Sequence, residues 1–272
     1  NLDANLAIGG NVNLQQGNLG FDTFDFSISG NLTRVAGKFD GDTGELILTG
    51  SGSTTLLSSA NYFATALHDF EIDRDETLIG ALTVEGDITL TSGTLDVDTY
   101  TLTFDGLNIT KASGLIDLTC TGATLDIGNA AGAVDIASAA GTSPFVSGQI
   151  YDLDFTSTQT VTLGQDLEIT NDFDQSAAGT LDIQDNKITF SGSFTNTAGD
   201  IDATDASSEV VISSAAADAV ATGDFVSDTF GTLTIEQDVT VPAITVATEL
   251  KLTAGTMDPG ANQLTLNRTI SR

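Results

Sequence analysis

The stretch that decides the fold of this protein runs from residue 86 to residue 96 and reads GDITLTSGTLD. Isoleucine and leucine alternate here with threonine, a period of two that gives a β-strand one apolar and one polar face. Glycine and aspartate, which favour turns, stand at the start, in the middle and at the end of the run. The stretch therefore predicts two short strands separated by a tight turn.

The second half of this stretch recurs along the chain as a phrase of glycine, a small residue, an apolar residue and aspartate, followed by another alternating run. Clear copies begin at Gly93, Gly179 and Gly255, and weaker copies begin at Gly37, Gly122 and Gly199. The same interval separates Gly37 from Gly93 and Gly199 from Gly255. We interpret this interval as three coils of a parallel β-helix, whose coils have about 20 residues each.

The composition supports the same fold class. The 272 residues include 41 Thr, 28 Gly and 30 Asp but only 8 Glu, and they include no Trp. Thr is a strand residue, whereas Asp and Gly belong in turns, and no convincing helical pattern is present. We expect an all-β parallel β-helix that forms a single solenoid over residues 1–272, with a more divergent part at 1–61 and degenerate coils at 62–272. One or two antiparallel β-sandwiches remain the alternative, since their strands alternate in the same way.

The charge excludes two classes of partner. Eight Lys and Arg against 38 Asp and Glu give a formal net charge of −30. No positive stripe is available to release counterions from a nucleic acid, and anionic membrane surfaces would repel the chain. The sequence contains no run of 18 apolar residues, so it predicts no membrane-spanning helix. The single cysteine excludes an internal disulfide framework.

The coil phrases, of which residues 86–96 are the clearest, resemble those of secreted microbial right-handed parallel β-helix proteins. That group includes adhesin and autotransporter passengers and filament-forming surface proteins, and the resemblance covers roughly residues 62–270. It implies a right-handed solenoid that is extracellular or on the cell surface, with a structural or adhesive role, and it names no partner. Surface glycans are a separate candidate partner. The phrase reflects coil geometry and implies no particular chemistry.

Some secreted β-helices that this chain resembles cleave polysaccharides with clustered carboxylates in an aromatic-lined groove. Carboxylate pairs at strand spacing, Asp96 with Asp98 and Asp152 with Asp154, are the candidates for an acid and a base here. The chain has no Trp, and His68 is its only histidine. We interpret the paired carboxylates as solvated side chains between inward apolar residues, and we expect the protein not to be an enzyme.

Calcium is the best chemical candidate for a bound ligand, because hard cations take oxygen ligands from carboxylates and turn carbonyls. The segment 40–45 reads DGDTGE and offers Asp40, Asp42 and Glu45 around two glycines. It does not match the twelve-residue EF-hand loop or the nonapeptide calcium-binding coil. Asp40, Asp42 and Glu45 are therefore weak candidates for a Ca²⁺ site, and we predict no other cofactor.

The two ends of the chain suggest a mechanism. Residues 6–14 read LAIGGNVNL and residues 264–270 read LTLNRTI, and neither segment has the pattern of a capping helix. Uncapped solenoid ends present open strand edges, and a head-to-tail contact that does not close into a ring propagates as a filament. We expect a self-assembling extracellular subunit of a filament, sheath or surface layer that polymerises with itself. An adhesin passenger is the alternative, followed by a polysaccharide-active enzyme.

Overall fold

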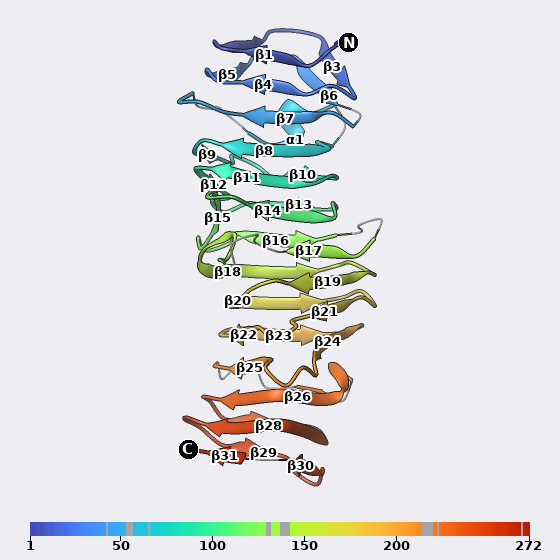
Figure 1. Ribbon diagram of the computed structural model, residues 1–272, viewed down its shortest axis with the longest axis vertical. Helices are drawn as coiled ribbons and strands as arrows, with labels where there is room; N and C mark the ends of the chain where they lie inside the picture. The colour runs from blue at the N-terminus through green and yellow to red at the C-terminus, as the bar shows by residue number, and fades with distance from the viewer. Residues whose placement is uncertain are drawn as a thin grey trace.

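The computed structural model describes residues 1–41, 43–52, 57–64, 66–128, 132–136, 142–213, 220–221, 223–267 and 269–272. The chain is nearly all β-structure, and a long parallel sheet winds into a solenoid of about 12 turns. Figure 1 shows the coils stacked along the long axis of the molecule, with the N-terminus at one end and the C-terminus at the other. Every pairing between the described strands is parallel, so the prediction of a β-helix is confirmed over the antiparallel sandwich.

The first strands of successive coils pair with one another along the whole axis, and we call them face A. Its members are β1 (Leu6–Ile8), β4 (Phe26–Ile28), β7 (Glu45–Leu48), β8 (Asp69–Asp73), β11 (Ile88–Ser92), β14 (Asn108–Lys111), β17 (Val134–Ile136), β19 (Thr160–Leu163), β21 (Thr180–Asp182), β24 (Asp200–Ala203), the first parts of β26 (Phe225–Ile235) and β28 (Ile244–Leu252), and β30 (Leu264–Leu266).

Two further columns of strands complete the coils. Face B consists of β9 (Glu76–Thr77), β12 (Thr94–Asp96), β15 (Leu115–Leu118), the first parts of β18 (Phe145–Phe155) and β20 (Leu167–Gln175), β22 (Lys187–Phe190), β25 (Glu209–Ile212), the second parts of β26 and β28, and β31 (Thr269–Ser271). Face C consists of β10 (Leu82–Val84), β13 (Thr101–Phe104), β16 (Thr124–Ile127), the second parts of β18 and β20, and β23 (Ser193–Asn196).

Smaller elements form the remaining sides of the coils near both ends. Three separate two-stranded sheets pair β2 (Val12–Leu14) with β5 (Leu32–Arg34), β3 (Asn18–Asp22) with β6 (Lys38–Gly41), and β27 (Val239–Thr240) with β29 (Met257–Asp258). In the described part of the chain the one helix is the short α1 (Ser59–Tyr62). Its Tyr62 is fully buried, so this turn of helix takes the place of a strand in closing the coil.

The recurring glycine phrase does not mark one place in the coil, which corrects our interpretation of its spacing. The copy at residues 94–96 forms β12 on face B, the copy at 180–182 forms β21 on face A, and the copy at 257–258 forms β29 in the small sheet with β27. The equal intervals likewise join different sides of the coil, from β6 to β12 and from β24 to β29, so they are not a whole number of coils. The physical reason is that the phrase encodes a strand that follows a tight turn, and each corner of a coil needs such a turn.

The first parts of two long strands each contain an unusual left-handed bulge, which makes a corner within the strand. Ser147 and Gly148 in β18 have φ values of 57° and 67°, and Ser227 and Asp228 in β26 have values of 55° and 47°. Both pairs follow the sequence Phe-Val, and at both the register to the preceding coil shifts. Left-handed backbone is costly for residues other than glycine, so we attribute the repeated Phe-Val-Ser sequence to this repeated corner.

The core is a continuous column of inward side chains along the axis. Leu, Ile, Val and Phe residues from all three faces are buried, and they alternate with outward Thr, Asp and Ser. Five phenylalanines form one aromatic stack from β20 to β26, namely Phe173, Phe190, Phe194, Phe225 and Phe230. Each coil thus buries its apolar face against the next, which is how a solenoid gains stability from nearest-neighbour contacts.

Candidate functional site

The acidic residues have a structural role at the corners of the coils. Asp side chains accept the backbone N–H of a residue in the next coil: Asp69 accepts that of Asp87 at 2.7 Å, and Asp166 accepts that of Lys187 at 2.8 Å. The same contact is made by Asp75 with Thr94, Asp87 with Asn108, Asp152 with Asp172, and Asp238 with Thr256. A short carboxylate close to the backbone suits this bond, which accounts for the preference for Asp over Glu.

Replacing Asp87 with alanine is expected to reduce the free energy of unfolding by about 1–2 kcal/mol, since the variant loses hydrogen bonds to a charged acceptor. The carboxylate of Asp87 accepts the backbone N–H of Leu107 at 3.2 Å, the backbone N–H of Asn108 at 3.0 Å and the Asn108 amide at 2.9 Å. Asp87→Asn is the matched control, because it keeps an acceptor oxygen and should lose less. Urea unfolding measures both, and equal stability of Asp87→Ala and the parent protein would contradict the corner role.

The few basic residues do little to neutralise this acidic surface. Arg34, Lys38 and Lys111 donate to backbone carbonyl oxygens, namely those of Gly37, Phe63 and Ser143. Within the described parts of the chain, the ion pairs are His68 with Asp69, Arg74 with Glu76, and Lys251 with Glu209. The outer surface consequently keeps most of its negative charge uncompensated.

The predicted calcium ligands lie on different elements. Asp40 is exposed on β6, where Gly20 is its partner in the register, whereas Glu45 begins β7 and lies opposite Asp69 of β8. Burial and the carboxylates of Glu71, Asp25 and Asp69 raise the pKa of Glu45 to about 7. Asp42 lies outside the described residues, so calcium binding by this segment stays a prediction. Among the residues that the structure describes, no three carboxylate, histidine or cysteine side chains are grouped to hold a metal ion.

A denser group of carboxylates lies on face C. Asp126 of β16, Asp154 of β18 and Asp174 of β20 are aligned in three successive coils, and Asp152 and Asp172 form a second column beside them. We call these five residues the carboxylate grid. Adjacent strands in a sheet are about 4.8 Å apart, so the aligned residues have carboxylates as close neighbours.

The grid residues differ in their hydrogen bonding. Asp126 accepts the Thr156 hydroxyl at 2.8 Å, and Asp152 accepts the Asn171 amide at 2.7 Å. Asp154 is half-buried, and no described residue donates a hydrogen bond to it. Burial, together with the charges of the other grid carboxylates, raises the pKa of Asp154.

Sequence reasoning singled out Asp152 and Asp154 as a pair but missed the grid. The two residues flank the buried Leu153, as the alternation predicts, so both point outward. The step along the sequence from Asp126 to Asp154 is longer than the step from Asp154 to Asp174. These unequal steps cannot be read from the sequence, because they depend on the length of each corner loop.

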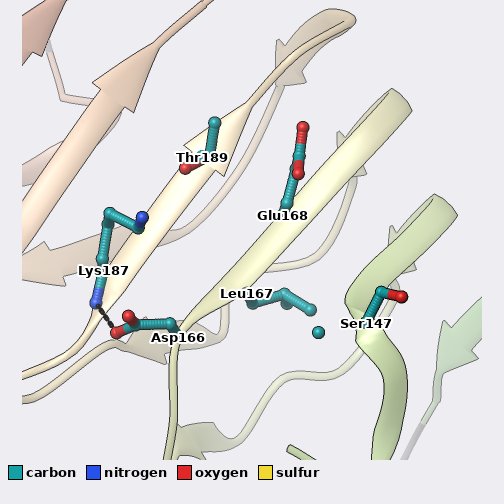
Figure 2. A pocket seen from close by; sticks show the side chains of 7 residues that line it. Ser147, Asp166, Leu167, Glu168, Lys187 and Thr189 are labelled. Atoms are coloured by element: carbon teal, nitrogen blue, oxygen red, sulfur yellow. Dashed lines mark hydrogen bonds between the residues drawn. The ribbon is translucent and has the colours of Figure 1, made fainter.

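A shallow polar pocket lies where β18, β20 and β22 adjoin (Figure 2). Its lining includes Ser147, Asp166, Glu168, Lys187 and Thr189. Figure 2 shows the hydrogen bond from the Lys187 backbone to Asp166, while Glu168 accepts from the Gln149 amide and the Ser191 hydroxyl, each at 2.8 Å. Both carboxylates are therefore engaged as acceptors that join neighbouring coils.

Asp96, His68 and Cys120 all lie close to further carboxylates. Asp96 accepts the backbone N–H of Asp98 at 2.8 Å, which stabilises the turn after β12. The Nδ1 atom of His68 lies 3.1 Å from Asp69, and the described residues that line the pocket beside His68 include Glu85 and Asp87 but no serine or cysteine. Cys120 is exposed in a turn, beside the carboxylates of Asp96, Asp117 and Asp98, with its pKa raised chiefly by desolvation.

Two global findings bear on function. No helix in the described ranges is long and apolar enough to cross a membrane. Comparison of the chain with protein-family models, curated proteins and solved structures found no match. The fold and the acidic surface therefore carry the functional argument: this chain is a β-solenoid repeat protein, an architecture consistent with a structural or surface role.

Proposed function

We propose that this protein is a structural subunit of an extracellular assembly such as a filament, sheath or surface layer, in which copies stack head to tail. The observation that carries the proposal is that the first and last described coils present strand edges and inward apolar side chains of the same kind that pair inside the solenoid. A strand edge of this kind is a template for pairing with another chain.

The N-terminal edge is formed by β1. The backbone N–H of Leu6 donates to Asp25 at 2.9 Å, and Ile8 accepts from Ser29 at 3.0 Å, so these two residues use their backbone groups toward β4. Backbone groups alternate between the two sides of a parallel strand, and those of Ala7 consequently point away from the solenoid. Leu6 is 36% exposed, although its register partner Phe26 is fully buried.

The C-terminal edge is formed by β31 and also exposes an apolar side chain. Ile270 of β31 is in register with Leu250, which is 2% exposed, yet Ile270 itself is 57% exposed. The side chain therefore occupies a core position that only a further coil would cover. Covering such apolar surface contributes about 25 cal/mol per Å².

The two ends of the solenoid have coils of the same length but differ in charge. Leu6 pairs with Phe26 and Ile244 pairs with Leu264, and the step along the sequence is the same in both cases. The sequence up to Asp25 contains three Asp and no Lys or Arg, whereas Arg268 and Arg272 lie in its closing segment. The closing segment also contains Asp258, so the two ends differ in charge and the first is the more acidic. This difference favours head-to-tail over head-to-head contact.

Ala7→Pro is expected to raise the concentration needed for assembly about tenfold, because proline removes one outward N–H and one intermolecular hydrogen bond. The change leaves the β1–β4 hydrogen bonds intact. Ala7→Thr, which keeps the N–H, is the matched control and should assemble like the parent protein. Sedimentation velocity across a concentration series, with negative-stain microscopy, measures the effect.

Two results would overturn the proposal. One is a parent protein that stays monomeric at high concentration in 0.5 M salt, where lateral charge repulsion is screened. The other is equal assembly of Ala7→Pro and the parent protein, which would exclude the β1 edge as the contact.

We keep one alternative function, that of an adhesin passenger that binds surface glycans. A binding screen against glycans, with monomeric protein, separates the adhesin role from self-assembly.

We also propose that the protein is not an enzyme, because Asp152, Asp166 and Glu168 serve as hydrogen-bond acceptors between coils. Release of reducing ends or unsaturated products from acidic polysaccharides would contradict this.

A further inference from the structure

We propose that the carboxylate grid is a proton-operated switch. Asp154 binds a proton from solution as the pH falls and tightens the three coils around it; as the pH rises, it releases the proton and loosens them. The switch goes beyond the proposed function, because it concerns the stability of the middle of the solenoid and needs no second copy of the chain.

Among the described residues, the charged groups that act on Asp154 are all carboxylates. Asp126 faces it from β16, Asp172 and Asp174 face it from β20, and Asp152 lies two positions before it on its own strand. The parallel register keeps these side chains on one face of the sheet in consecutive coils, so the coils cannot separate their charges without breaking the strand pairing. Protonation of one member of the column is the way to relieve the repulsion.

Asp154 is the member that takes the proton because of its hydrogen bonding and its burial. The Thr156 hydroxyl and the Asn171 amide donate hydrogen bonds to Asp126 and Asp152, whereas no described residue donates one to Asp154. Asp174 is exposed and Asp154 is half-buried, so Asp154 also loses more solvation as an anion. A protonated Asp154 gains a donor, with which it can bind the carboxylate of Asp126 or Asp174 in the adjacent coil.

The direction of the pH effect follows from the same contacts. Burial and the neighbouring carboxylates raise the pKa of Asp154 above its ordinary value of 3.8. The folded state therefore binds this proton more tightly than the unfolded state does. The resulting stability is fully present below pH 3.8 and is lost as the pH rises through the pKa of the folded protein.

Asp154→Asn tests the switch, with Asp135→Asn as the matched control. Both variants remove one negative charge from an outward strand position, but Asp135 is exposed on β17 and has Asn108 and Thr162 as register partners. At pH 8 we expect Asp154→Asn to melt about 2–4 °C above the parent protein. At pH 4 this difference should shrink to near zero, and Asp135→Asn should show no such pH dependence.

A second variant and a local measurement make the result decisive. Asp174→Asn removes one facing charge and should give a smaller stabilisation at pH 8. Protection factors from backbone hydrogen exchange in β16, β18 and β20 should be higher at pH 4.5 than at pH 8 in the parent protein and nearly constant in Asp154→Asn. Identical pH profiles for Asp154→Asn and Asp135→Asn, or a change in protection spread evenly over all coils, would overturn the proposal.

Discussion

Replacing Arg74 with alanine is expected to lower the free energy of unfolding by about 3–5 kcal/mol, the range found when one partner of a buried ion pair is removed. Arg74 follows β8 and is 4% exposed, as is its partner Glu76 at the start of β9. Removing the guanidinium would leave the Glu76 carboxylate buried without its counter-ion.

The guanidinium also connects coils that are distant in sequence. Its Nη1 atom donates to the backbone carbonyl of Gly30 at 2.8 Å and to that of Thr49 at 3.1 Å. These acceptors lie in two earlier coils of the solenoid. Alanine cannot donate to these part-buried carbonyls, and carbonyls that lose their donor add to the cost.

Arg34→Ala is the control for loss of a positive charge, because Arg34 is more accessible and donates only to nearby carbonyls of its own turn. We expect it to cost less than about 1 kcal/mol. The double variant Arg74→Met with Glu76→Met should recover most of the lost stability, since an apolar pair of similar volume often replaces a buried ion pair without loss. Guanidinium chloride unfolding measures all three. A cost for Arg74→Ala no larger than that for Arg34→Ala would contradict the buried role.

Replacing Phe190 with alanine is expected to cost about 3–5 kcal/mol, because the variant leaves a cavity in the aromatic stack. Phe190 on β22 is 1% exposed, and its ring centroid lies 5.3 Å from that of Phe173 and 4.9 Å from that of Phe194. The stack continues from Phe194 to Phe225 at 6.1 Å. Phe190 therefore lies where the rings of several consecutive coils are in contact.

The loss should also change the shape of the unfolding curve. In a solenoid each coil contacts only its neighbours, so a weak interface lets the coils on either side unfold separately. We expect a single transition in the parent protein and two transitions in Phe190→Ala. Phe190→Leu, which keeps most of the volume, is the control and should cost less than about 1.5 kcal/mol. One cooperative transition at an unchanged midpoint in Phe190→Ala would contradict this account of the core.

The fold class follows from the sequence because it depends on local rules. In residues 86–96, alternation gives each strand an inner face, and the Gly and Asp residues supply the turns. Short strands with one apolar face bury it most simply by stacking coil on coil. The sequence did not predict the number of coils between two copies of the glycine phrase, because β12, β21 and β29 contain this phrase at different corners of the coil.

The candidate site depends on neighbours that only the tertiary structure brings together. The step along the sequence from one coil to the next is short between Thr229 and Thr245 and twice as long between Leu118 and Ile150. The sequence predicts that Asp154 points outward, but the lengths of the corner loops decide which side chains flank it.

The sequence by itself determined the strand pattern, the acidic surface and the stacked architecture, all of which arise from periodicity and composition. The tertiary structure alone decided that Asp154 lies between two other carboxylates and that Arg74 is buried against earlier coils. Loop lengths set the register, and a change of register exchanges every neighbour on a face while leaving the pattern of each strand unchanged.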